Sequence, residues 1–209
     1  SRAEFLWTAA QRQGLRTLVL NYPTGWPALD DGQLVVGGVA PGGHPDWRLA
    51  KPRVFSRDAP RVLPMDLAAN QFAHTPVSFA PDGDDLVGAV DVLDGQPHRL
   101  TLRLIRGPAG FERMLVTDAA GAELARLAAG EWSPWIHLPH DGGPVAFRLK
   151  LAALSGDGRQ VELYRTDVVR LTGWSHPPSL AAEFSDRFGP YVEGLESPCV
   201  PADDRRRPS

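Results

Sequence analysis

The first forty residues follow the pattern of a helix, a strand, a loop and a second strand. Residues 3–13 predict a helix that ends at Gly14, a common C-terminal stop. Its apolar side chains share one face: Leu6, Ala9 and Ala10. The continuous apolar run 18–20 predicts a short strand buried on both faces, as in a parallel sheet, and the run 34–36 predicts the next strand.

The pattern changes to a period of two between about residue 77 and residue 171. Apolar residues alternate with polar ones in three runs: Leu100, Leu102 and Leu104; Val145, Phe147, Leu149 and Leu151; Val161 and Leu163. Turn signals separate the runs: Asp94-Gly95, Gly121, Asp141-Gly142-Gly143 and Gly156-Asp157-Gly158. Short alternating strands with regular turns predict an antiparallel sheet or sandwich.

A second helix is predicted near the end of the chain. Pro178 suits its first turn, Gly189-Pro190 ends it, and three apolar residues lie four apart on one face: Leu180, Phe184 and Phe188.

Four consecutive segments follow from the patterns: a helix–strand piece of an α/β core (1–40), an irregular Pro/Gly-rich connection (41–76), an antiparallel β insert domain (77–171), and a return segment with a helix and polar tail (172–209). The predicted fold class is α+β and mainly β.

Composition excludes several classes of function. The 209 residues are 43% hydrophobic, which is enough for a core, and the net charge of −3 argues against a nucleic-acid surface. The single cysteine, Cys199, excludes an intrachain disulfide and a cysteine-based zinc site. No apolar run reaches the ~20 residues of a membrane span. The chain does not begin with methionine and enters a helix-like pattern at once, which predicts a fragment; the compartment stays open.

Candidate chemical motifs are incomplete. The glycines at 37–43 lack the lysine of a phosphate-binding loop, because Gly43 stands at its place. His137 and His140 suggest a metal site, but no third ligand is indicated nearby, so a role at a strand end is favoured. The acidic group Asp82, Asp84 and Asp85 lacks the glycine and glutamate of a calcium loop and indicates a solvated turn before a strand.

The tryptophans allow two interpretations. Trp132 and Trp135, three residues apart, are expected on opposite faces of a strand, so that one packs inward while the other faces a groove. Core and interface packing is the simpler interpretation. The alternative is a stand-alone β-sandwich module that binds a carbohydrate or another ligand through Trp132, Trp135 and Trp174.

Three stretches, taken in order, resemble the type I phosphodiesterase/nucleotide pyrophosphatase family of the alkaline phosphatase superfamily. The first, Phe5 to Gly14 with Val19 to Pro27, is similar to the helix and strand that follow the family's nucleophile. The second, Gly130 to Ile136 with Val145 to Leu149, looks like an insert of a bacterial and archaeal subgroup. The third, His176 to Tyr191, resembles the segment that returns the chain to the main sheet.

The resemblance implies a parent hydrolase with two divalent metal ions, usually zinc, and a threonine or serine nucleophile. The nucleophile motif would precede residue 1 and the Asp/His ligand motifs would follow residue 209, so neither a catalytic residue nor a metal ligand is assigned to this chain. The flanking pieces would belong to an alkaline-phosphatase-like α/β sheet. The expected partner is the remainder of the parent chain, and these 209 residues alone are expected to be inactive.

One binding region is predicted from sheet geometry. Ligands of open α/β sheets bind outside the carboxyl ends of the strands, and residues 21–26 leave that end of the first strand. Tyr22 and Trp26 are candidate apolar walls for a substrate, while Asn21 and Thr24 offer hydrogen bonds. The alternative is a proline-rich turn with a structural tryptophan.

Overall fold

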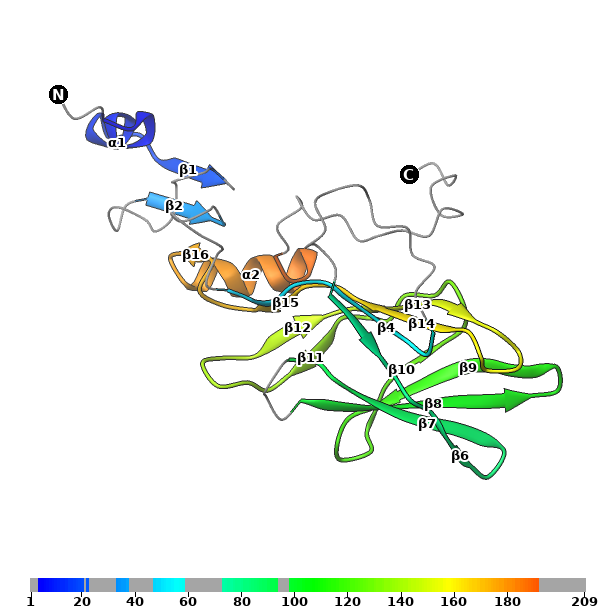
Figure 1. Cartoon of the computed structure of the whole chain (residues 1–209). Helices are drawn as coiled ribbons and strands as arrows, with labels where there is room; N and C mark the ends of the chain where they lie inside the picture. The colour runs from blue at the N-terminus through cyan, green and yellow to red at the C-terminus, as the bar shows by residue number, and fades with distance from the viewer. Residues whose placement is uncertain are drawn as a thin grey trace. The chain divides into compact units, whose positions relative to one another are not determined.

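The computed structural model describes residues 4–20, 22, 33–37, 47–58, 73–93 and 98–191. Its helices are α1 (Leu6–Arg12) and α2 (Ser179–Phe188). Its strands are β1 (Thr17–Leu20), β2 (Gln33–Val36), β3 (Arg48–Ala50), β4 (Arg53–Ser56), β5 (Ala73–Pro76), β6 (Ala80–Asp82), β7 (Asp85–Asp91), β8 (Arg99–Gly107), β9 (Gly110–Thr117), β10 (Glu123–Leu127), β11 (Ile136–Leu138), β12 (Val145–Phe147), β13 (Leu149–Leu154), β14 (Val161–Arg165), β15 (Val168–Arg170) and β16 (Ser175–His176). The chain is therefore mainly β, as predicted (Figure 1).

The strands form sheets with the orders β1-β2-β16, β10-β9-β8-β7-β6, β11-β12-β15-β3 and β13-β14-β4-β5. The chain divides into two compact units, each built from separate stretches of sequence. Unit 1 contains residues 1–49, 139–146 and 169–193, and unit 2 contains residues 50–138, 147–168 and 194–209. The units thus interleave along the sequence, whereas the patterns predicted consecutive segments.

Unit 1 holds the predicted α/β piece. β1 and β2 pair in parallel, with Thr17 opposite Gln33, and β16 pairs antiparallel to the other side of β2. A core cluster contains Val36, Trp47, Trp174 and Ala181, with Leu180, Phe184 and Tyr191 packed against it. The apolar face predicted for the second helix therefore does face a core, through two of its three residues.

The helix ends agree with the sequence signals. Gly14 follows α1 with a φ of +78°, and Gly189 follows α2 with a φ of +87°, a conformation that glycine adopts without a steric penalty. Pro178 is the N-cap of α2, as its fixed φ favours. Glu4 precedes α1 and pairs with Arg12 at 3.0 Å. Neither described helix is long and apolar enough to cross a membrane.

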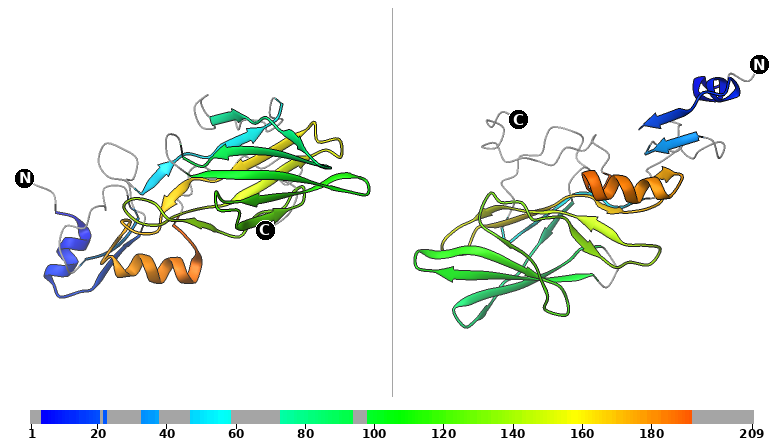
Figure 2. Two further views of the ribbon diagram at one scale, coloured as in Figure 1. Left: turned by 90° about the horizontal axis from the view of Figure 1, so that it is seen from below. Right: turned by 180° about the vertical axis from the view of Figure 1, so that it is seen from behind.

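Unit 2 is a two-layer β structure. Its five-stranded sheet, β10-β9-β8-β7-β6, is antiparallel throughout, and its four-stranded sheet, β13-β14-β4-β5, lies over it (Figures 1 and 2). The predicted alternation is confirmed along β8, where Leu100, Leu102 and Leu104 are buried and the side chains between them are only partly buried. Along β12, β13 and β14 most of the intervening residues are buried as well. β4 and β5 come from the segment predicted to be an irregular connection, and β4 lies inside the sheet.

The first strand departs from its prediction in one respect. Its parallel pairing is confirmed, but burial on both faces is wrong, because Leu18 and Leu20 are 56% and 60% exposed while Val19 between them is buried. β1 is an edge strand in its sheet. A continuous apolar run predicts two covered faces, and here side chains of the described chain cover one of them.

Candidate functional site

The predicted binding loop is described at one position. Asn21, Thr24 and Trp26 lie outside the described residues. Tyr22 is 51% exposed, and its ring meets the Trp7 ring edge-on with centroids 5.2 Å apart. The structure therefore places Tyr22 beside α1, at the carboxyl end of β1.

Tyr22 lines an apolar groove between α1 and β1, which we call the α1–β1 groove. Its volume is about 490 Å³, and it is lined by Leu6, Trp7, Ala10, Thr17, Leu18, Val19, Leu20 and Tyr22. The groove is open because α1 has no buried residue and Leu6 is largely exposed. The helical spacing of Leu6 and Ala10, and the extended run of β1, put these side chains on one surface.

The α1–β1 groove also contains polar atoms without partners. The Trp7 indole N–H and the Thr17 hydroxyl are buried and make no hydrogen bond with the described residues. Buried polar groups without partners cost about 1–3 kcal/mol each, so native structures usually satisfy them. An occupant with both apolar side chains and hydrogen-bonding groups would suit this surface.

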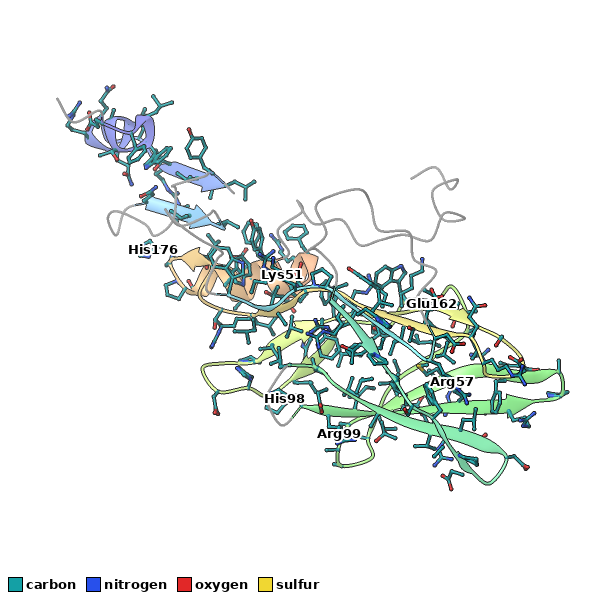
Figure 3. The ribbon with its side chains drawn as sticks, in the orientation of Figure 1. Lys51, Arg57, His98, Arg99, Glu162 and His176 are labelled. Carbon is teal, nitrogen blue, oxygen red and sulfur yellow. The ribbon has the colours of Figure 1, made fainter. Side chains whose placement is uncertain are left out.

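A second candidate lies in unit 2, on the polar face of the sheet β13-β14-β4-β5. The alternation predicts that Lys150, Glu162 and Tyr164 face solvent, yet they are only 4%, 5% and 2% exposed. Lys150 lies opposite Tyr164 in the β13–β14 register, so these side chains share a face. Figure 3 shows Glu162 on the side of β14 turned away from the five-stranded sheet. Buried charges of this kind are a signal of either a structural network or a site.

Trp132 lies at this polar face, and both Trp132 and Trp135 lie within 6 Å of Arg148. The guanidinium carbon of Arg148 lies 5.3 Å from the Trp132 ring centroid and 5.9 Å from the Trp135 centroid. The prediction of opposite strand faces is therefore wrong for this pair. The reason is local: residues 133–135 are not in a strand, and only Trp132 forms a β-bridge, with Lys150. Pro134 lacks the N–H that a continued ladder requires.

Arg148 is the functional candidate that sequence reasoning missed. The sequence shows a charged residue at a polar position of an alternating run. It does not predict the contact, because Arg148 is far from both tryptophans along the chain. Trp174, the third tryptophan of the predicted binding module, is instead fully buried in the unit 1 core.

One serine–histidine pair resembles a nucleophile and its base. The Ser56 Oγ and the His74 Nε2 are 2.8 Å apart. However, the Ser56 hydroxyl donates to the carbonyl of Asp58, and Ser56 is buried at 1% exposure. A nucleophile needs a base that accepts its proton and access to substrate. The pair therefore caps a strand end in this structure.

The other acidic and histidine candidates form no metal site among the described residues. No group of three or more His, Cys, Asp or Glu side chains is placed to hold an ion there, and this search included His137 and His140. Asp82 and Asp85 flank the β6–β7 turn and bind Arg103 at 2.5 Å and 3.2 Å. The hydrogen bonds that Arg103 donates to these two carboxylates raise its pKa. The predicted solvated turn is thus tied to β8.

Three comparisons with known proteins complete the description of these sites. The chain matches no protein-family model, no curated protein and no solved structure. The functional conclusions therefore rest on the sequence patterns, on the α1–β1 groove, and on the geometry of Arg148 with Trp132 and Trp135.

Proposed function

We propose that this chain is the β-rich insert, with flanking sheet pieces, of a metal-dependent phosphoester hydrolase of the phosphodiesterase/nucleotide pyrophosphatase type. In this proposal unit 2 shapes substrate access. The nucleophile and the two divalent metal ions, of which zinc is the expected kind, belong to the remainder of the parent chain. The ordered resemblance of three stretches supports the family, and the α1–β1 groove supports the assignment as a part of a larger sheet.

The observation that carries the proposal is the distribution of exposed apolar side chains. The large hydrophobic residues exposed among the described positions are Phe5, Leu6, Leu15, Leu18, Leu20, Tyr22 and Phe188. All of them lie in the helix–strand piece or the return segment, where a parental sheet is expected to dock. Parallel strands are usually covered on both faces, so a parallel pair that exposes leucines is suited to further packing.

The occupant that fits the α1–β1 groove best is a neighbouring strand and helix of the parental sheet. β1 is an edge strand, and an added strand would pair with its free backbone groups. Apolar side chains from the same layer would cover Leu18 and Leu20. Polar groups near the groove would reach the Trp7 and Thr17 atoms that have no hydrogen-bond partner among the described residues.

Mutation of β1 tests the docking surface. The double variant Leu18→Asp, Leu20→Asp should leave the thermal stability of the 209-residue chain within about 0.5 kcal/mol, because exposed positions tolerate charge. It should also reduce self-association measured by light scattering, because two apolar side chains leave the surface.

Val19→Asp is the matched control, since Val19 lies on the buried face of the same strand. It should destabilise unit 1 by about 2–5 kcal/mol, because an unpaired charge would be buried. Equal destabilisation by both variants would show that the leucines pack inside the chain and would remove the docking surface.

Catalysis provides a second test. The 209-residue chain, supplied with zinc or manganese, should not hydrolyse nitrophenyl phosphate monoesters or diesters above the buffer rate, because the proposal places the nucleophile and ligands elsewhere. Metal-dependent turnover that a chelator abolishes would contradict the proposal and would indicate a complete site within these residues.

A β-sandwich binding module is the second candidate function. The two-layer architecture of unit 2 and the half-buried Trp132 and Trp135 favour it. Trp174 does not support it, because its ring lies in the core. Tryptophan fluorescence during titration with a panel of neutral glycans separates the candidates, since a saturable response would favour the module and a flat response would argue against it.

A further inference from the structure

We propose that Trp132, Arg148 and Trp135 form a binding site for an anionic oxygen group, a carboxylate or a phosphate, carried by a small organic ligand. This inference goes beyond the proposed function, because it assigns a ligand to unit 2 itself and needs no parental sheet. We call the three residues the Trp–Arg–Trp site.

The first argument is the placement of the cation. Arg148 is half-buried, and its guanidinium carbon lies 5.3 Å from the Trp132 ring centroid and 5.9 Å from the Trp135 centroid. Its Nε donates a hydrogen bond to the Ser133 carbonyl at 2.9 Å, and its backbone N–H donates to the Thr166 hydroxyl at 3.0 Å. Cation–π contacts and these hydrogen bonds hold the fork in one orientation.

The second argument is the missing anion. Within the described residues Arg148 forms no ion pair, and its two terminal nitrogens donate to no protein acceptor. By contrast, Arg103, Arg126 and Arg187 each pair with a carboxylate. A partly buried guanidinium that retains its free donors offers two parallel N–H groups to an incoming carboxylate or phosphate.

The third argument is preorganisation. The Trp132 ring meets the Tyr164 ring edge-on at 5.9 Å and 90°, and Tyr164 is buried in the sheet. Ser133, also buried, accepts a hydrogen bond from the Leu149 N–H and donates one to the Pro134 carbonyl. The loop that carries both tryptophans is therefore fixed before any ligand arrives, which lowers the entropic cost of binding.

The surroundings define the ligand class. The Lys150 ammonium lies 5.6 Å from the Trp132 centroid, so a second positive charge lies near the same ring. The indole faces toward Arg148 are occupied by its guanidinium, which leaves no free platform there for a neutral sugar. Ring edges beside the cation would contact the organic part of an acid. A sugar acid or a phosphorylated sugar has both features.

The test is a titration of the 209-residue chain with glucuronate, glucose 6-phosphate, glucose and inorganic phosphate, followed by two-dimensional NMR of the indole and arginine Nε–H signals. We expect saturable shifts at the Trp132, Trp135 and Arg148 signals with glucuronate or glucose 6-phosphate, with a dissociation constant of about 1 mM. Glucose should produce none. Inorganic phosphate tests whether the sugar contributes to binding. If inorganic phosphate binds as tightly as glucose 6-phosphate, the organic part contributes nothing, which would contradict the assignment of a small organic ligand.

Variants locate the binding. Arg148→Gln should weaken binding about tenfold or more, because the charge-assisted pair is lost. Arg148→Lys keeps the charge but not the planar fork and should weaken it by a smaller factor. Arg159→Gln, whose side chain is 85% exposed, is the matched control and should bind like the parent chain.

Several outcomes would overturn the inference. One is that glucose produces the same signal shifts as glucuronate. Another is that neither glucuronate nor glucose 6-phosphate produces any shift. A third is that the Arg148 and Arg159 variants lose the same amount of binding affinity. Because Arg148→Gln is able to disturb the fold, the backbone amide spectrum of unit 2 is recorded for each variant. If Arg148→Gln disrupts that spectrum, Arg148→Lys alone decides, and unchanged binding by it would also overturn the inference.

Discussion

Trp174→Ala should destabilise unit 1 by about 3–5 kcal/mol, because it removes one of the two largest apolar side chains of a packed core. Trp174 is fully buried and stacks on Tyr191 with centroids 5.2 Å apart. It lies in the core cluster with Val36, Trp47 and Ala181. Hydrogen exchange followed by mass spectrometry is the suitable measurement, because peptides from the two units report their opening separately.

Leu18→Ala is the control for this prediction. Leu18 belongs to the same unit and is also a large apolar residue, but its side chain is exposed. Truncating it to alanine should therefore lower the free energy of unfolding by less than about 0.5 kcal/mol. Faster exchange confined to unit 1 in Trp174→Ala, and none in Leu18→Ala, is expected. A large effect of Leu18→Ala would indicate that the α1–β1 groove is already filled by this chain.

Arg165→Met should destabilise unit 2 by about 3 kcal/mol or more, because the buried Val92 carbonyl and the partly buried Lys51 carbonyl would lose their donors at about 1–3 kcal/mol each. Arg165 is 1% exposed, and its guanidinium donates to the Val92 carbonyl at 2.6 Å and to the Lys51 carbonyl. Methionine retains much of the volume, so the change isolates the hydrogen bonds from a cavity. Urea unfolding followed by circular dichroism measures the loss.

Arg159→Met is the matched control for the second prediction. Its side chain is exposed and pairs with Asp157 at 3.7 Å, a surface contact worth little. The unfolding midpoint should therefore stay close to that of the unchanged chain. Similar midpoints for Arg165→Met and Arg159→Met would show that the Arg165 donors contribute nothing to stability.

The two units differ in how many large apolar side chains they expose, and this difference bears on function. The exposed apolar surface gathers around α1 and β1 in unit 1, whereas unit 2 buries its alternating leucines and even several charges. An exposed apolar surface in unit 1 and a β structure with its own buried core in unit 2 support the proposal of an insert attached to pieces of a larger sheet. The Trp–Arg–Trp site gives that β structure a binding role of its own to test.

The sequence by itself determined the local structure. Periods of two and of about 3.6 residues identified the runs that form β8, β12, β13 and β14 and both helices, because side-chain direction follows backbone geometry. The strands β4 and β5 were not identified, since their segment has no sustained period. Gly14, Pro178 and Gly189 marked helix ends for the same reason. Asn21, Thr24 and Trp26 stay a prediction, as they lie outside the described residues.

Only the tertiary structure decided which faces are covered and which distant residues meet. Periodicity places Leu18 and Leu20 on one face of β1, but it does not say that this face is exposed. Likewise it places Lys150 and Glu162 on the polar face of their sheet, but it does not say that these charged side chains are buried. Burial depends on what packs from elsewhere in the chain. In the same way, Arg148 meets Trp132 and Trp135 through the β-bridge at Lys150, a long-range pairing that no local pattern contains.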